Sequence, residues 1–202
     1  SPIASDRVAE AQSLRKEMEK LSPSAQVYVA GLILDILAPA QSLTKHLADL
    51  LQRPAANYPL SYQDNFAAPL PHITKMLSLA QMLMARSEAA LLLDRSSEAF
   101  EDTMMILGLE QTMKNQPLMI VLLVRESMLA LAMAPHNQGI LHHRWNDFQL
   151  GAIQSGLLRI DLREDLATAY RGERASFYTC LRQMTDTKAS KLRPWRRLTW
   201  SS

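Results

Sequence analysis

Residues 73–113 have the sequence ITKMLSLAQMLMARSEAALLLDRSSEAFEDTMMILGLEQTM, which predicts two long helices joined by a tight turn. In the first segment, apolar residues recur at helical spacing at positions 73, 76, 77, 80, 83, 84 and 91. The second segment carries a broad apolar stripe from Phe100 to Met113. Between them, Asp94 to Ser97 supplies turn-forming residues and a serine able to cap the second helix. A short turn between two long amphipathic helices predicts that they lie antiparallel.

Helical periodicity continues on both sides of this pair. Breaks are expected at Pro39, across the proline-rich loop 53–71, and at Pro135, because proline lacks the backbone N–H that a helix interior needs. We therefore predict one all-α domain over residues 1–187, with six or seven mostly antiparallel helices arranged as a bundle or a stack of helical hairpins. Residues 188–202 are expected to form a separate basic tail.

The composition excludes several classes of protein. Of 202 residues, 48% are hydrophobic and 21% charged, which argues against a disordered chain. One cysteine cannot form a disulfide scaffold or a cysteine-based zinc module. A net charge of +2 argues against nucleic-acid binding over the whole surface. The sequence has no HExxH metal motif, no GxSxG nucleophile elbow and no glycine-rich phosphate loop, so we expect no metal ion and no cofactor.

Four charged residues are candidates for a buried polar network. Arg125 and Glu126 lie at the centre of the most apolar segment, residues 118–134, and Glu173 falls on the apolar stripe of the last helix. A buried carboxylate needs a partner, and Arg125 or Arg174 could supply it. Three interpretations of these residues remain open. They form a structural ion-pair network, they line a functional polar pocket, or a bent helix exposes them to solvent.

The proline-rich loop contains a second set of candidates. Tyr58 and Tyr62 give this loop apolar surface to bury, and His72 follows it directly. A strap packed across the helices is the favoured interpretation, with a functional loop or groove as the alternative. The 11 methionines are expected to fill the core, although methionine also suits a plastic groove for apolar ligands or partner helices.

The C-terminal tail combines positive charge with tryptophan. Its candidate contacts for an anionic surface are Lys191, Arg193, Trp195, Arg196 and Arg197. Such a segment suits an anionic membrane surface or nucleic acid. The alternative is a linker whose Trp195 docks on the body of the domain.

Six short sequence elements follow one another along the chain in a characteristic order. They are Tyr58-Pro59, Leu70-Pro71-His72, Ala85-Arg86, Ala99-x-x-Asp102, the apolar helix after Pro117, and Gly172-Glu173-Arg174-Ala175. Over about residues 58–182 the chain resembles a set of uncharacterised bacterial helical proteins, often exported or anchored by an N-terminal membrane segment. This resemblance implies a location in the cell envelope, and we expect the membrane anchor to be missing from this chain. The alternative is a location in the cytoplasm. It implies no activity.

The helix pair 73–113 also looks like a tetratricopeptide hairpin. It departs from that repeat because its turn lacks glycine and no period near 34 residues recurs. As function we expect a non-catalytic binding or scaffolding domain that presents a helical groove to a protein or peptide. The alternative is an enzyme with a polar pocket around Glu173, Arg125 and Glu126. A third hypothesis attaches the domain to membrane or nucleic acid through its tail.

Overall fold

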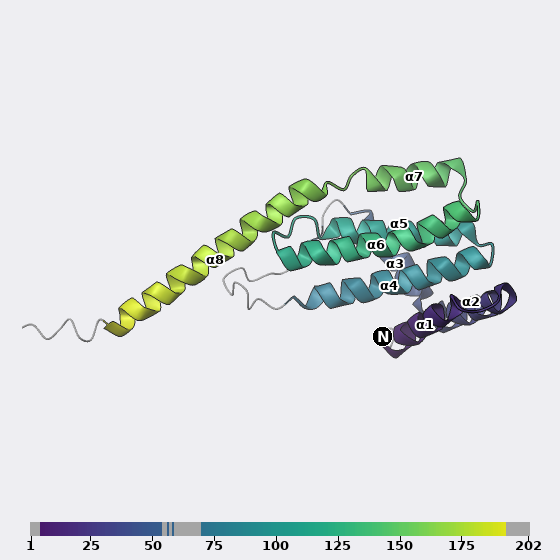
Figure 1. Ribbon diagram of the computed structural model, residues 1–202, viewed down its shortest axis with the longest axis horizontal. Helices are drawn as coiled ribbons and strands as arrows, with labels where there is room; N and C mark the ends of the chain where they lie inside the picture. Colours follow the sequence, from purple (N-terminus) through teal and green to yellow (C-terminus); the bar gives the residue numbers. More distant parts are fainter. Residues whose placement is uncertain (1–4, 54–55, 57, 59–69, 193–202) are drawn as a thin grey trace, which may run out of the picture.

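The computed structural model describes residues 5–53, 56, 58 and 70–192 (Figure 1). This part of the chain contains eight α-helices, where six or seven were predicted, and no strand, which confirms the prediction of an all-α bundle. The elements are α1 (Ser5–Met18), α2 (Pro23–Leu37), the 3-10 turn η1 (Ala38–Ala40), α3 (Gln41–Leu51), α4 (Pro71–Leu92), α5 (Ser96–Thr112), α6 (Met119–Leu141), α7 (Asp147–Leu157) and α8 (Leu162–Leu192).

Helix α4 forms the centre of the bundle. It packs against α5, α6, α2 and α1, and nearly every residue from Ala80 to Leu91 is buried. Four alanines of α4, at positions 80, 85, 89 and 90, are at most 1% exposed, and their small side chains allow neighbouring helices to approach closely. The predicted α4–α5 hairpin is present, with residues 93–95 between the helices. Burial of each large aliphatic side chain in this core contributes about 1.5–3 kcal/mol.

The two prolines expected to break helices behave differently. At Pro39 the prediction is confirmed, since α2 ends at Leu37 and a 3-10 turn follows. At Pro135 the prediction is wrong, because α6 continues through this residue to Leu141. The last turns of α6 are held by Trp145, whose Nε1 donates a hydrogen bond to the carbonyl of His136 at 2.9 Å. A Cβ added at Gly139 would lie 2.0 Å from the Trp145 ring, so the indole rests directly on the helix backbone.

Helix α8 packs on α6 and then extends away from the bundle (Figure 1). The prediction that its apolar stripe faces the core holds for Ala169 and is wrong for the large side chains of the stripe, which are exposed. Instead the docking side contains Asp165 and Ala169, both at most 5% exposed, and Gly172. A Cβ on Gly172 would lie 1.8 Å from the carbonyl oxygen of Pro117, so only glycine permits this approach. The docking side lies roughly 90° around the helix from the apolar stripe.

Two segments are long and apolar enough to cross a membrane by length and composition, namely Pro23–Leu51 and Met119–Leu141. The first is interrupted by the turn at Pro39, and the second is α6. Core helices of water-soluble proteins meet the same criterion. In this structure α6 packs against α4, α5 and α8 and carries the buried Arg125 in its first half.

Candidate functional site

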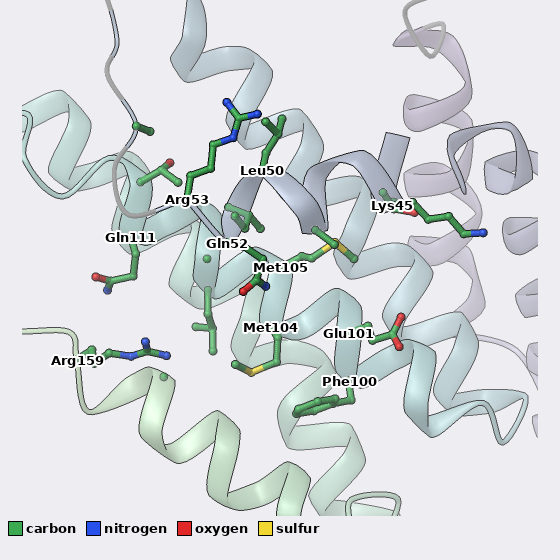
Figure 2. A pocket seen from close by; sticks show the side chains of 18 of the residues that line it. Lys45, Leu50, Gln52, Arg53, Phe100, Glu101, Met104, Met105, Gln111 and Arg159 are labelled. Atoms are coloured by element: carbon green, nitrogen blue, oxygen red, sulfur yellow. The ribbon is translucent and has the colours of Figure 1, made fainter. Parts of the chain in front are cut away.

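A cleft of about 620 Å³ lies between α3, α5 and the end of α7 (Figure 2). Its apolar lining comes mainly from α5, with Phe100, Met104, Met105 and Leu107. Helices α3 and α7 both approach α5 closely at glycine residues. A Cβ on Gly108 of α5 would lie 3.0 Å from Leu51 Cδ1 at the end of α3. The cleft therefore combines a close helix approach at a glycine with an adaptable thioether lining.

Positive charge surrounds this cleft. Lys45 on α3, Arg53 after α3 and Arg159 after α7 are exposed, and none of them forms an ion pair with another described residue. Figure 2 shows Arg159 extending from the end of α7 toward α5. Glu101 contributes one exposed carboxylate to the lining. Unpaired cations along a concave surface attract anionic groups. We call this site the basic cleft.

One wall of the basic cleft is fixed by a charged cluster. Arg86 on α4 donates to both carboxylate oxygens of Asp102 on α5, at 2.7 and 2.6 Å, and to Thr44 Oγ1 on α3 at 2.9 Å. Asp102 is fully buried, and burial raises the pKa of this carboxyl to about 7 while Arg86 opposes the rise. The cluster joins three helices, so Arg86 serves packing although it lines the cleft.

Arg125 is buried as predicted, but its partners are carboxylates other than Glu173. Its Nε donates to Glu110 Oε1 of α5 at 2.8 Å, and its Nη2 donates to Asp165 Oδ2 of α8 at 2.8 Å. All three residues are at most 5% exposed. Burial raises the pKa of Glu110, and Gln111 donates a further hydrogen bond to its second oxygen at 2.8 Å. This cluster ties α8 to the bundle.

The other predicted members of that network lie apart from Arg125. Glu126 and Arg174 are exposed. Glu173 is partly buried, and its Oε1 accepts a hydrogen bond from the backbone N–H of Met119 at 2.9 Å. Because Met119 is the first residue of α6, this carboxylate satisfies an unpaired N–H at a helix N-terminus. The four predicted residues therefore do not form one network.

The predicted loop candidates form a packed contact on α5. The rings of Tyr58 and His72 stack with centroids 4.4 Å apart and planes 20° apart. The hydroxyl of Tyr58 lies 2.8 Å from Thr112 Oγ1, and His72 Nε2 lies 2.9 Å from Gln116 Oε1. This geometry favours the interpretation of a strap, as far as the described residues extend.

Some predicted residues fall outside the described part of the chain. Tyr62 lies there, as do Arg193, Trp195, Arg196 and Arg197 of the tail. Lys191 lies in the last turn of α8, where the structure describes the backbone alone. Among the described residues, no group of three or more histidine, cysteine, aspartate or glutamate side chains is arranged to hold a metal ion.

Comparison of the chain with protein families, with curated proteins and with solved structures gives no match.

Proposed function

We propose that this chain is a non-catalytic binding domain that receives an acidic, partly apolar segment of another protein in the basic cleft. The observation that carries this proposal is a set of three exposed cations around an apolar lining, Lys45, Arg53 and Arg159, which form no ion pair within the part of the chain that the structure describes. Carboxylates of a bound segment would pair with these cations while its apolar side chains contact the partly exposed Phe100 and Met104. Methionine-lined surfaces adapt to side chains of different shape, which suits recognition of a peptide.

The arrangement of the buried charges also supports binding over catalysis. Acid–base chemistry needs titratable groups within reach of one bound molecule. Arg125 is buried against its two carboxylates, Glu126 is exposed, and Glu173 caps α6. No cavity described in the structure is lined by all three, so the alternative of an enzyme built on them gains no support.

Two further features belong to the same proposal. The α4–α5 hairpin looks like a tetratricopeptide unit, and in this proposal it serves as the rigid support for the cleft. The resemblance to exported or anchored bacterial proteins suggests that the binding takes place at the cell envelope.

Fluorescence anisotropy with three labelled peptides of equal length tests this function. The first alternates glutamate and leucine, the second replaces each glutamate by glutamine, and the third replaces each glutamate by lysine. We expect the acidic peptide to bind most tightly, with affinity that falls as salt concentration rises, because charge pairing at an exposed surface is screened.

Two triple variants provide the comparison. The cleft variant carries Lys45→Ala, Arg53→Ala and Arg159→Ala, and the control carries Lys16→Ala, Lys20→Ala and Lys75→Ala at exposed positions that do not line the cleft. Each triple variant removes three positive charges. The proposal predicts that the cleft variant loses acidic-peptide binding and the control retains it. Equal loss in both, or no preference among the peptides, would contradict it.

A further inference from the structure

Helix α8 carries an exposed apolar face that the proposed function does not use. We call it the α8 stripe, and its six large side chains are each 43–68% exposed: Leu162, Leu166, Tyr170, Phe177, Leu181 and Met184. They recur at helical spacing on one side of the helix. A contiguous apolar surface of this kind marks an interaction site, whereas single exposed apolar residues need no explanation.

The stripe continues onto the body of the domain. Where α8 crosses α6, Met119, Ile120, Leu123, Tyr170 and Glu173 line a hollow of about 540 Å³. Ile120 is 48% exposed and Leu123 is 52% exposed, so α6 adds apolar surface beside the α8 stripe. None of these residues lines the basic cleft. The hollow is therefore a second, separate surface.

The two halves of α8 differ in how much of the body they contact. The first half docks on α6 through Asp165 and Ala169, and residues 181–185 are all exposed. Figure 1 shows this later part extending beyond the bundle. One half of the stripe thus lies beside the hollow, and the other half projects into solvent with Phe177, Leu181 and Met184 exposed.

We infer that the α8 stripe binds the same stripe of a second copy of this chain, with the two helices antiparallel. A two-fold interface needs a surface that is complementary to itself. An antiparallel pairing centred between residues 173 and 174 of α8 provides this. It places Leu166 opposite Leu181 and Tyr170 opposite Phe177 of the second copy.

Charge supports the same register. The central pair places Glu173 of each copy beside Arg174 of the other, so opposite charges meet twice across the axis. A parallel pairing in register would instead place Glu173 opposite Glu173, and like charges at this position destabilise. The projecting half of each α8 then covers the hollow of the other copy, so both apolar halves are buried by one contact.

Sedimentation equilibrium of the full chain over a wide concentration range tests this pairing. The expected result is a reversible dimer. Phe177→Asp should raise the dimer Kd by about 100-fold, because a charge replaces a central aromatic contact. Tyr178→Asp is the matched control, since Tyr178 is also an exposed aromatic of the projecting half but lies off the stripe. Both positions lie beyond the docking contacts with α6, so folding of the bundle does not depend on them.

Pulsed electron–electron distance measurements test the orientation. Cys180 is replaced by serine, and a single spin label is placed in turn at positions 175, 179 and 182 of the polar face. In an antiparallel pair, the separation of the labels along the helix axis grows by about 3 Å for each residue away from the centre, because each helix rises about 1.5 Å per residue.

The inference is overturned if the chain is a monomer at every concentration, if Phe177→Asp and Tyr178→Asp weaken the dimer equally, or if the three distances are equal. Vesicles of phosphatidylglycerol and phosphatidylcholine provide one more readout. Chain that sediments with these vesicles as a monomer, and no longer does so as Phe177→Asp, would assign the stripe to a lipid surface and also overturn the inference.

Discussion

Replacement of Arg125 by methionine is the strongest test of how this bundle is held together. Methionine preserves much of the side-chain volume but removes the cation that Glu110 and Asp165 share. The two carboxylates are 1% and 5% exposed, so each would remain desolvated without its ionic partner. Removing one partner of a buried ion pair costs about 3–5 kcal/mol. Because a domain of this kind has a net stability of about 5–15 kcal/mol, the variant should lose a large part of it.

The stability lost in Arg125→Met should increase as pH rises. Burial raises the pKa of Glu110 in the folded protein, and removal of Arg125 raises it further because the guanidinium opposes the rise. A carboxyl group whose pKa is raised on folding binds more protons in the folded state, so its contribution to stability decreases as pH rises through the folded pKa. The stability difference between Arg125→Met and the parent chain should therefore be larger at about pH 7.5 than at about pH 5.

Urea unfolding followed by far-ultraviolet circular dichroism measures this difference at both pH values. Arg182→Met is the matched control, because Arg182 is an exposed arginine of α8 that lies off the α8 stripe, and its substitution should change stability by less than about 0.5 kcal/mol. If Arg125→Met lowered stability by less than about 1 kcal/mol at neutral pH, or by the same amount at both pH values, the buried-cluster reasoning would be refuted.

Two further predictions follow from single sites. Burial raises the pKa of Asp102 from 3.8 to about 7, so the parent chain should lose stability between about pH 4 and about pH 7, and Asp102→Asn should flatten this dependence in urea unfolding at a series of pH values. A dependence unchanged by Asp102→Asn would contradict the assignment. Gly172→Ala should destabilise by about 1–3 kcal/mol and expose α8 to limited proteolysis, because the new Cβ collides with the Pro117 carbonyl. Gly151→Ala is the control, because a Cβ at this position on α7 meets open space, and it should be neutral or stabilising by up to about 1 kcal/mol. Equal effects of the two substitutions on stability would contradict this explanation.

The helices of the bundle could be predicted because helical periodicity reports burial directly. The apolar positions of α4 illustrate this, since Ala80, Leu83 and Leu91 are all at most 3% exposed. The effect of Pro135 could not be predicted from its neighbours. In the structure α6 runs through Pro135, and Trp145, later in the chain, packs on the last turns of this helix and donates a hydrogen bond to the carbonyl of His136. Local sequence rules contain no such tertiary contact.

The candidate site was less predictable, since periodicity does not specify what covers an apolar face. The stripe of α8 was expected to face the core, but docking follows the side where Asp165 reaches Arg125 and Gly172 permits close approach. A usable signal was present for one missed residue. Glu110 lies on the apolar stripe of α5, as Glu173 does on α8, and it is the residue that pairs with Arg125. The cations of the basic cleft come from two segments, α3 with the residues directly after it and the end of α7, and only tertiary packing brings Arg159 near the other two.

The most direct test of the proposed function is a nuclear magnetic resonance titration of protein labelled with carbon-13 on the methionine methyl groups. Met104 and Met105 line the basic cleft, Met128 is fully buried in the core, and Met184 lies on the α8 stripe. Addition of the acidic peptide should shift the methyl signals of Met104 and Met105, leave those of Met128 and Met184 in place, and have no effect in the cleft triple variant. Unchanged signals at Met104 and Met105 on saturation with peptide, or shifts centred on Met184, would contradict the account.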